Sequence, residues 1–231
     1  MREDYSEELC ARLCLLTHTA WDDSLPRTFT RAALQALDEN AVLDGLVLRE
    51  SASVPQKTLL RARLLLTRTT GVFEQIQQYE KQGYCGLVRK SSNWPDALHV
   101  LRKDEPHFLF AKGNQKLLKT DCVAVAGSRI ITEETAVMAA RLGRMMASEK
   151  LTMVCGGANG VDTAAQNAIL DAGGNLIIVP AVSVEKVIRQ EREKRALDEG
   201  RLLVLCDALP DSPFSSHKAL GRNHTIYALG R

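Results

Sequence analysis

LTMVCGGANGVDTAAQNAILDAGGNLIIVP, residues 151–180, carries the pattern that decides the fold. Its two ends, LTMVC and NLIIVP, are nearly continuous apolar runs with the length of a buried strand. Between them, a glycine-rich turn leads into VDTAAQNAILDA, whose apolar residues have helical spacing. The stretch therefore predicts a strand, a helix over 161–172 and a second strand, which together make one β-α-β unit.

The same alternation continues on both sides of this unit. We predict strands over 122–127, 151–156, 175–180 and 201–206, with further helices over 132–148 and 184–198. A short apolar run, HFLFA, precedes them at 107–111. Apolar strands that alternate with amphipathic helices are typical of a parallel sheet covered by helices on both faces. The predicted fold class of residues 83–231 is therefore α/β, in a Rossmann-like arrangement.

The first part of the chain has a different pattern of apolar residues, which is typical of helices. ELCARLCLL, RAALQALDENAVLDGLV and LLRARLLLTRTTGVFEQIQQYEKQG carry apolar residues at helical spacings, with breakers such as Pro26 and Pro55 between them. We predict a helical region over 1–82 in front of the Rossmann-like domain at 83–231. A length of 231 residues agrees with two units of this kind.

Composition excludes several classes of protein. The 30 Lys and Arg residues nearly balance the 28 Asp and Glu residues, so any nucleic-acid site must be local and not a property of the global charge. The six cysteines form no CxxC pair, which argues against a zinc site and favours buried thiols. No apolar run reaches the length of a membrane span. We predict a cytoplasmic protein without a metal, a cofactor or a membrane partner.

The turns that follow the predicted strands are the candidate site. In a doubly wound sheet, ligands bind outside the carboxyl ends of the strands. Gly127-Ser128-Arg129 follows one strand and GGANG, residues 156–160, follows the next. Ala181-Val182-Ser183, with Lys186 one turn on, follows the third, and a long loop that leads to Arg222 follows the fourth. Glycine turns and helix N-termini suit a phosphate, although the spacing matches neither GxGxxG nor a P-loop.

One acidic and one basic side chain in these turns could either bind a ligand or support the structure. Asp162 lies in the first turn of a predicted helix, where an acid ordinarily satisfies the amides and the dipole of that helix, so we predict a structural role for it. Arg129 either binds the anion together with Arg222, 93 positions further on, or pairs with Asp162 and pins two turns.

Several ordered motifs resemble one protein family. PHFLFAKGNQKLLKTDCVAVAGSR, GGANGVDTAAQNAILDAGG and ALGRNHTIYAL are similar to the KGN, GSR, GGA-GID-AH-AL and RNR-I motifs of the DNA-processing protein A family, also called DprA or Smf. WPDAL at 94–98 resembles the lead-in of that family. The resemblance covers roughly residues 83–229 and places the chain in the wider superfamily of lysine-decarboxylase-like (SLOG) Rossmann folds.

The resemblance implies a function and a set of site residues. It implies an extended Rossmann domain that binds single-stranded DNA, loads the recombinase RecA onto it and protects incoming DNA in natural transformation. A homodimer is one possible oligomeric state. No catalytic residue is expected. The residues expected to bind DNA phosphate are Gly127, Ser128, Arg129, Gly156, Gly157, Ala158, Asn159, Gly160, Lys186, Arg222 and Asn223.

The chain also departs from the family pattern. Gln166 stands where the family usually has His, and His224 replaces the second Arg of RNR. The segment VEKVIRQEREKRALDEG replaces a YP-containing segment, and its mixed charges favour a solvated helix face over the alternative of a nucleic-acid contact. The chain stops at Arg231, before the last strands and the winged-helix domain of the family, so we expect a C-terminal truncation.

Two other functions stay open at this point. The phosphoribohydrolases of the same superfamily have a GGG–GLMG–A stretch similar to GGANGVDTAAQNA and bind a nucleoside monophosphate, but the PGGxGTxxE motif with their catalytic acid is absent here. A nucleotide-sensing module is the other alternative. Phe214 and Tyr227 lie near the late motif, either as core residues or as stacking platforms for bases.

Overall fold

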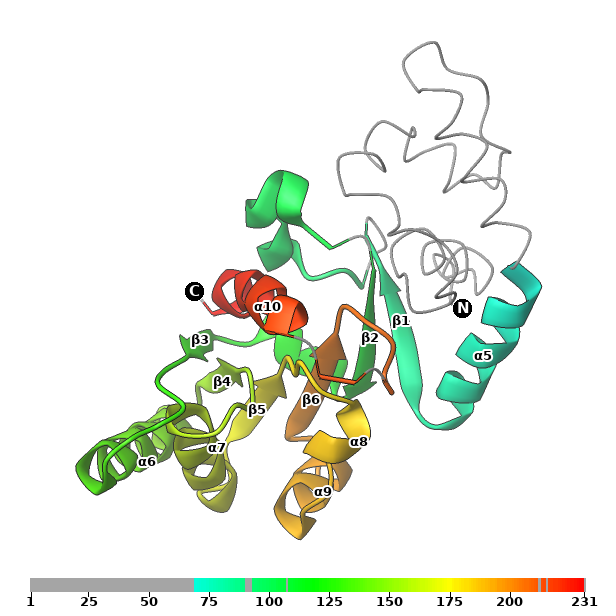
Figure 1. The fold of residues 1–231 in the computed structure, drawn as a ribbon. Helices are drawn as coiled ribbons and strands as arrows, with labels where there is room; N and C mark the ends of the chain where they lie inside the picture. Colours follow the sequence, from blue (N-terminus) through cyan, green and yellow to red (C-terminus); the bar gives the residue numbers. More distant parts are fainter. Residues whose placement is uncertain (1–68, 90–92, 107, 212, 215, 231) are drawn as a thin grey trace. The chain divides into compact units, whose positions relative to one another are not determined.

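The computed structural model describes residues 69–230 except 90–92, 107, 212 and 215 (Figure 1). The described chain forms two units. One contains residues 69–94 and 106–109, and the other contains residues 95–105 and 110–230. Most of the helical region predicted over 1–82 lies outside the described residues, so that prediction and its domain boundary remain predictions.

The first unit consists of a helix and two neighbouring strands. It contains helix α5 (Thr69–Lys81), strand β1 (Tyr84–Val88) and the beginning of strand β2 (Phe108–Gly113). The rings of Tyr79 and Tyr84 meet edge to face with centroids 5.9 Å apart, which fixes the end of α5 against the start of β1. Ile76 and Leu87 are fully buried in this unit.

The second unit contains the predicted parallel sheet. Its strands are β3 (Cys122–Val125), β4 (Thr152–Cys155), β5 (Asn175–Ile178) and β6 (Leu202–Cys206). β3 pairs with β4, β4 with β5 and β5 with β6, each in parallel. Every residue of β4 and β6 is buried, as expected of strands that are covered on both faces. The four predicted strands and their direction are confirmed.

Helices flank this sheet. α6 (Glu133–Ser148), α7 (Val161–Asp171) and α9 (Glu191–Asp198) lie on one side of it, and α10 (Ser216–Leu229) lies on the other (Figure 1). The side chain of Thr132 caps α6 by accepting the amide hydrogen of Thr135 at 3.3 Å. Gly143 allows α6 to approach α7 closely, because a Cβ there would meet the Ala165 carbonyl. The α/β class with helices on both faces is confirmed.

The apolar run HFLFA departs from the all-parallel expectation. Residues 108–111 of this run lie in β2, which pairs with β6 in the antiparallel direction, with Phe110 opposite Cys206. The strand order in the second unit is β2-β6-β5-β4-β3. The next strand, β3, begins at Cys122 on the far edge, and only the short helix η3 (Gln115–Lys119) and its flanks join the two. Because a parallel crossover needs a dozen or more residues, β2 runs antiparallel to the other strands of this unit and ends at the same end of the sheet at which β3 starts.

The helix predicted over 184–198 is two helices. The structure has α8 (Val184–Val187) and α9, with Gln190 extended between them. Val184 and Ile188 are buried in the first part, and Glu193 and Ala196 in the second. The step of five residues from Ile188 to Glu193 does not fit the three-to-four spacing of one helix face, so a single helix could not bury both pairs.

One further element packs against α10. η2 (Asp96–Asp104) is kinked at Arg102, which has φ 51°. His99 Nδ1 lies 2.8 Å from a carboxylate oxygen of Glu105, which is buried. Over the described ranges, no helix is long and apolar enough to cross a membrane. The same part of the chain holds no group of three or more His, Cys, Asp or Glu residues that could bind a metal.

Candidate functional site

The turn after β3 presents one unpaired arginine. The hydroxyl of Ser128 donates to the Ile130 carbonyl at 2.6 Å, and the Ile130 amide donates back to Ser128 Oγ at 3.2 Å. These two bonds close the turn. The neighbouring Arg129 is exposed and forms no hydrogen bond or ion pair with any described residue. Its guanidinium group is therefore available to a ligand.

The turns after β3 and β4 interlock. The Val161 amide donates to the Ser128 carbonyl at 3.1 Å. Gly160 has φ 87°, and a Cβ there would strike the backbone of Ser128 and Arg129. On the other side, a Cβ at Gly127 would lie 2.6 Å from the Cβ of Val161. These glycines therefore allow two turns to touch, and only glycine tolerates the backbone conformation of Gly160.

Asp162 holds the glycine turn from inside. Its side chain is 4% exposed, and Oδ2 accepts the amide hydrogens of Gly156 at 3.1 Å and Ala158 at 3.4 Å. We predicted that this acid serves amides, and it does, but they belong to the preceding turn and not to its own helix. Those two amides, predicted to face a phosphate, are thus engaged within the protein. At the tip of the turn, the amides of Asn159 and Gly160 meet no acceptor among the described residues.

Arg222 joins α10 to the same place. Its side chain is 5% exposed, and Nη1 donates to the carbonyl of Val179, directly after β5. The guanidinium group lies against Gly156, where a Cβ would collide with it. Its Nε is buried and has no hydrogen-bond partner in the described structure. These contacts bring the three predicted motifs together, although residues 222–223, predicted in a loop, lie within helix α10. We call residues 127–129, 156–160 and 222–223 the three-turn site, after the three predicted turns.

Charged side chains of both signs surround the Arg222 guanidinium and shift its pKa. Burial lowers the pKa of the Arg222 guanidinium, the carboxylates of Asp162 and Asp207 raise it, and the positive charge of Arg129 lowers it. The two arginines are thus close enough to repel each other. Asp162 acts on Arg222 and forms no bond with Arg129, so the pairing of Arg129 with Asp162 that we considered is absent from the described contacts.

A buried thiol lies beneath the site. Burial, and to a smaller extent the nearby Asp162 carboxylate, raises the pKa of the Cys155 thiol from its ordinary 9.0 to about 12. Its thiol points to Gln166 Oε1 at 3.9 Å, and Gln166 Nε2 donates to Glu193 Oε1 at 3.1 Å. Glu193 is 2% exposed, and its Oε2 has no partner among the described residues. Gln166, where the family usually has His, thus connects the floor of the turn to α9.

This thiol predicts a loss of stability at alkaline pH. The folded-state pKa of Cys155 lies above the unfolded value, so its contribution is fully present below pH 9 and is lost as the pH rises toward about 12. Between pH 8 and pH 10, one such thiol costs about 1.4 kcal/mol of unfolding free energy. Urea melts of the wild type and of Cys155→Ala at both pH values measure it. Equal pH dependence in the two proteins would contradict the prediction.

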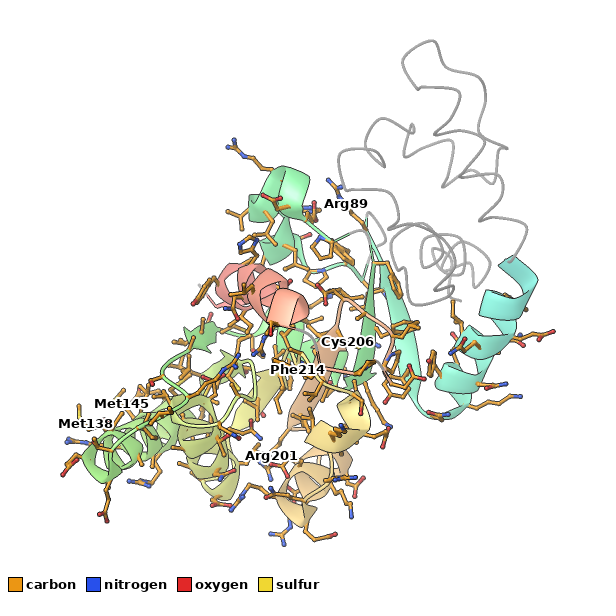
Figure 2. All side chains as sticks on the ribbon, in the orientation of Figure 1. Arg89, Met138, Met145, Arg201, Cys206 and Phe214 are labelled. Atoms are coloured by element: carbon orange, nitrogen blue, oxygen red, sulfur yellow. The ribbon has the colours of Figure 1, made fainter. Side chains whose placement is uncertain are left out.

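Other predicted residues lie apart from these contacts. Lys186, on α8, is exposed and forms no hydrogen bond or ion pair with the three turns in the described structure, while its neighbour Glu185 pairs with Lys112 at 3.0 Å. Asn223 is partly exposed beside Arg222. Phe214, in the loop after β6 (labelled in Figure 2), is 50% exposed. Tyr227, on α10, is 58% exposed, so neither residue belongs to the core.

Sequence reasoning missed three contributors to the site. Val161 locks two turns, the Val179 carbonyl binds Arg222, and the carboxylate of Asp207 acts on the charge of Arg222. Val179 lies near the end of the strand predicted over 175–180 and Asp207 directly follows the one predicted over 201–206, so their place at the carboxyl ends of these strands was predictable. A backbone carbonyl leaves no signal in residue type, and its role needed the structure.

The chain is similar in sequence to known proteins. The family model for DNA recombination-mediator protein A matches residues 86–231. The DNA processing protein DprA of Streptococcus pneumoniae is 39% identical over 131 residues, which cover 55% of this chain and 45% of that protein. The chain therefore spans less than half the length of this curated relative.

Two solved structures are similar as well. The X-ray structure of DNA processing protein A from S. pneumoniae has a TM-score of 0.67 at 23% identity, over 98% of this chain and 76% of the other, which supports the fold. The structure described as "Structural insights into the unique single-stranded DNA binding mode of DNA processing protein A from Helicobacter pylori" has a TM-score of 0.52 at 29% identity, over 64% of this chain and 66% of the other.

Proposed function

Because this chain belongs to the DNA recombination-mediator protein A family, we propose that it binds single-stranded DNA at the three-turn site. The observation that carries the proposal is Arg129, an exposed cation without a described partner at the carboxyl edge of a parallel sheet. This edge is where ligands of such sheets bind. The name of the H. pylori structure describes a single-stranded DNA binding mode for that relative.

The chemistry of the site suits a phosphate. The Arg129 fork can donate two parallel hydrogen bonds to phosphate oxygens. The unengaged amides of Asn159 and Gly160 lie at the N-terminus of α7, where the helix dipole favours an anion. Arg222 adds positive potential from beneath, and the Asp162 carboxylate keeps the turn in shape. Arg129 and these two amides are the proposed direct contacts.

The proposal extends to the role that the family implies. Bound single-stranded DNA would be handed to RecA, and the process served would be DNA recombination after DNA uptake, in natural transformation. A homodimer is part of this proposal, as is a cytoplasmic location. The free thiols of the four described cysteines support that location, because reducing compartments keep thiols unpaired. The protein would act by binding and not as an enzyme.

Titration with labelled oligo-dT and, separately, with AMP tests the proposed function. If phosphate contacts dominate, the logarithm of the affinity for oligo-dT should fall with the logarithm of salt concentration, at a slope of about −0.7 per phosphate neutralised. A slope near zero, or no binding of oligo-dT, would contradict the proposal. Tight binding of AMP without oligo-dT binding would instead favour a nucleotide site of the phosphoribohydrolase kind.

A further inference from the structure

We propose that Arg222 is a positioning residue that acts on the ligand through the Gly156 turn, and that Gly156 is a glycine because Arg222 lies on it. The inference rests on the proposed function for its ligand, single-stranded DNA. It assigns the two arginines of the site different roles, with Arg129 binding phosphate at the surface and Arg222 shaping the turn from within.

The contacts of Arg222 support a role inside the protein. Nη1 donates to the Val179 carbonyl at the end of β5, and the guanidinium lies directly against Gly156 at the end of β4. One side chain of α10 therefore connects the ends of two adjacent strands. With 5% of the side chain exposed and Nε buried, little of the cation is left for a ligand to touch.

The Gly156 turn connects Arg222 to the amides that we propose to face the ligand. The amide of Gly156 donates to Asp162, and so does the amide of Ala158, so the turn is held from below by the carboxylate and from beside by the guanidinium. The unengaged amides of Asn159 and Gly160 follow directly along the chain. A shift of the guanidinium would therefore move the turn and the amides that we propose to face phosphate.

A double-mutant cycle between Gly156 and Arg222 tests this coupling. Gly156→Ala should weaken oligo-dT binding by about tenfold or more, because the new Cβ displaces the guanidinium. Arg222→Ala should weaken it to a similar extent. Since Arg222→Ala removes the group that the Cβ strikes, the double variant should bind no worse than Arg222→Ala alone. Additive losses would overturn the inference.

Two further variants separate shape from charge. Arg222→Lys keeps the charge but cannot both cover Gly156 and donate to Val179, so it should not restore binding. Arg222→Ala should leave the salt slope unchanged, whereas loss of a phosphate contact lowers its magnitude by about 0.7. Full rescue by Lys, or a slope reduced by one phosphate, would make Arg222 a direct ligand. Gly221→Ala, the adjacent glycine of α10 with open space around it, is the matched control and should bind normally.

Thermal melting keeps this test independent of DNA binding. Gly156→Ala should lower the Tm of the wild type by several degrees and leave the Tm of Arg222→Ala nearly unchanged. If the wild type does not bind oligo-dT, the proposed function fails while the coupling is still read from melting. If the wild type binds but the cycle shows no coupling, only the role of Arg222 fails. Should Arg222→Ala not fold, Arg222→Met, which keeps the stem, takes its place in the cycle.

Discussion

Arg129→Ala should weaken binding of single-stranded DNA by about 10- to 150-fold and leave the Tm of the protein unchanged. A charge-assisted bond to phosphate contributes roughly 1.5–3 kcal/mol, and every 1.4 kcal/mol is about tenfold in affinity. The exposed side chain has no described partner to lose, so the fold should not depend on it. Fluorescence anisotropy with labelled oligo-dT, next to a melting curve, measures both quantities.

Two variants control for charge. Arg129→Lys should recover only part of the affinity, because an ammonium group cannot reproduce the planar fork of arginine. Arg141→Ala removes an exposed arginine from α6, outside the three-turn site, and should change affinity little at moderate salt. Loss of stability with intact affinity in Arg129→Ala, or an equal loss of affinity in Arg141→Ala, would rule out Arg129 as the specific phosphate contact.

Asp162→Ala should have the largest effect on stability at the site, lowering the free energy of unfolding by about 3 kcal/mol. It leaves two inward-facing amides without their acceptor, at roughly 1–3 kcal/mol for a buried unsatisfied group, and removes a negative charge that balances the buried Arg222. For a chain of this size, the Tm should fall by about 6–12 °C. Circular dichroism melting and urea titration give both numbers.

The matched control is an aspartate that forms only a surface pair. Asp171, at the end of α7, is bonded to Arg192 Nε at 2.6 Å and is largely exposed, so Asp171→Ala should cost less than about 1 kcal/mol. Asp162→Asn retains one acceptor oxygen and should fall between wild type and Asp162→Ala. Equal melting of the Asp162→Ala and Asp171→Ala variants would show that the inward carboxylate does not hold the turn.

The sheet and its order along the chain were predictable because burial of both faces leaves a strong sequence pattern. Short, wholly apolar runs such as TMVC and LLVLC are typical of strands buried on both faces. The helices between these runs indicate that the strands are parallel. The direction of β2 was not readable from HFLFA, since an apolar run carries no sign of direction. It follows from the length of chain that joins β2 to β3, which becomes decisive only when both edges of the sheet are known.

The motifs of the site were readable, but the direction in which their polar groups point was not. GSR and GGANG predict a phosphate-binding site at the carboxyl ends of the strands, and the structure brings the two turns into contact through Gly160 and Val161. The sequence could not show that Asp162 turns back to Gly156 and Ala158, or that Arg222 is buried on a glycine. Both depend on a close approach between segments distant in sequence, which residue types alone do not specify.

The interlocked turns have a consequence for the thermodynamics of binding. Gly127 against Val161, Gly160 against Ser128 and Gly156 against Arg222 leave these backbones little freedom before any ligand arrives. A preorganised site loses little conformational entropy when an anion binds, so most of the interaction energy appears as affinity. The main entropic cost then falls on the flexible nucleic acid, whose length and stiffness, more than any rearrangement of the protein, would set how tightly a given strand is held.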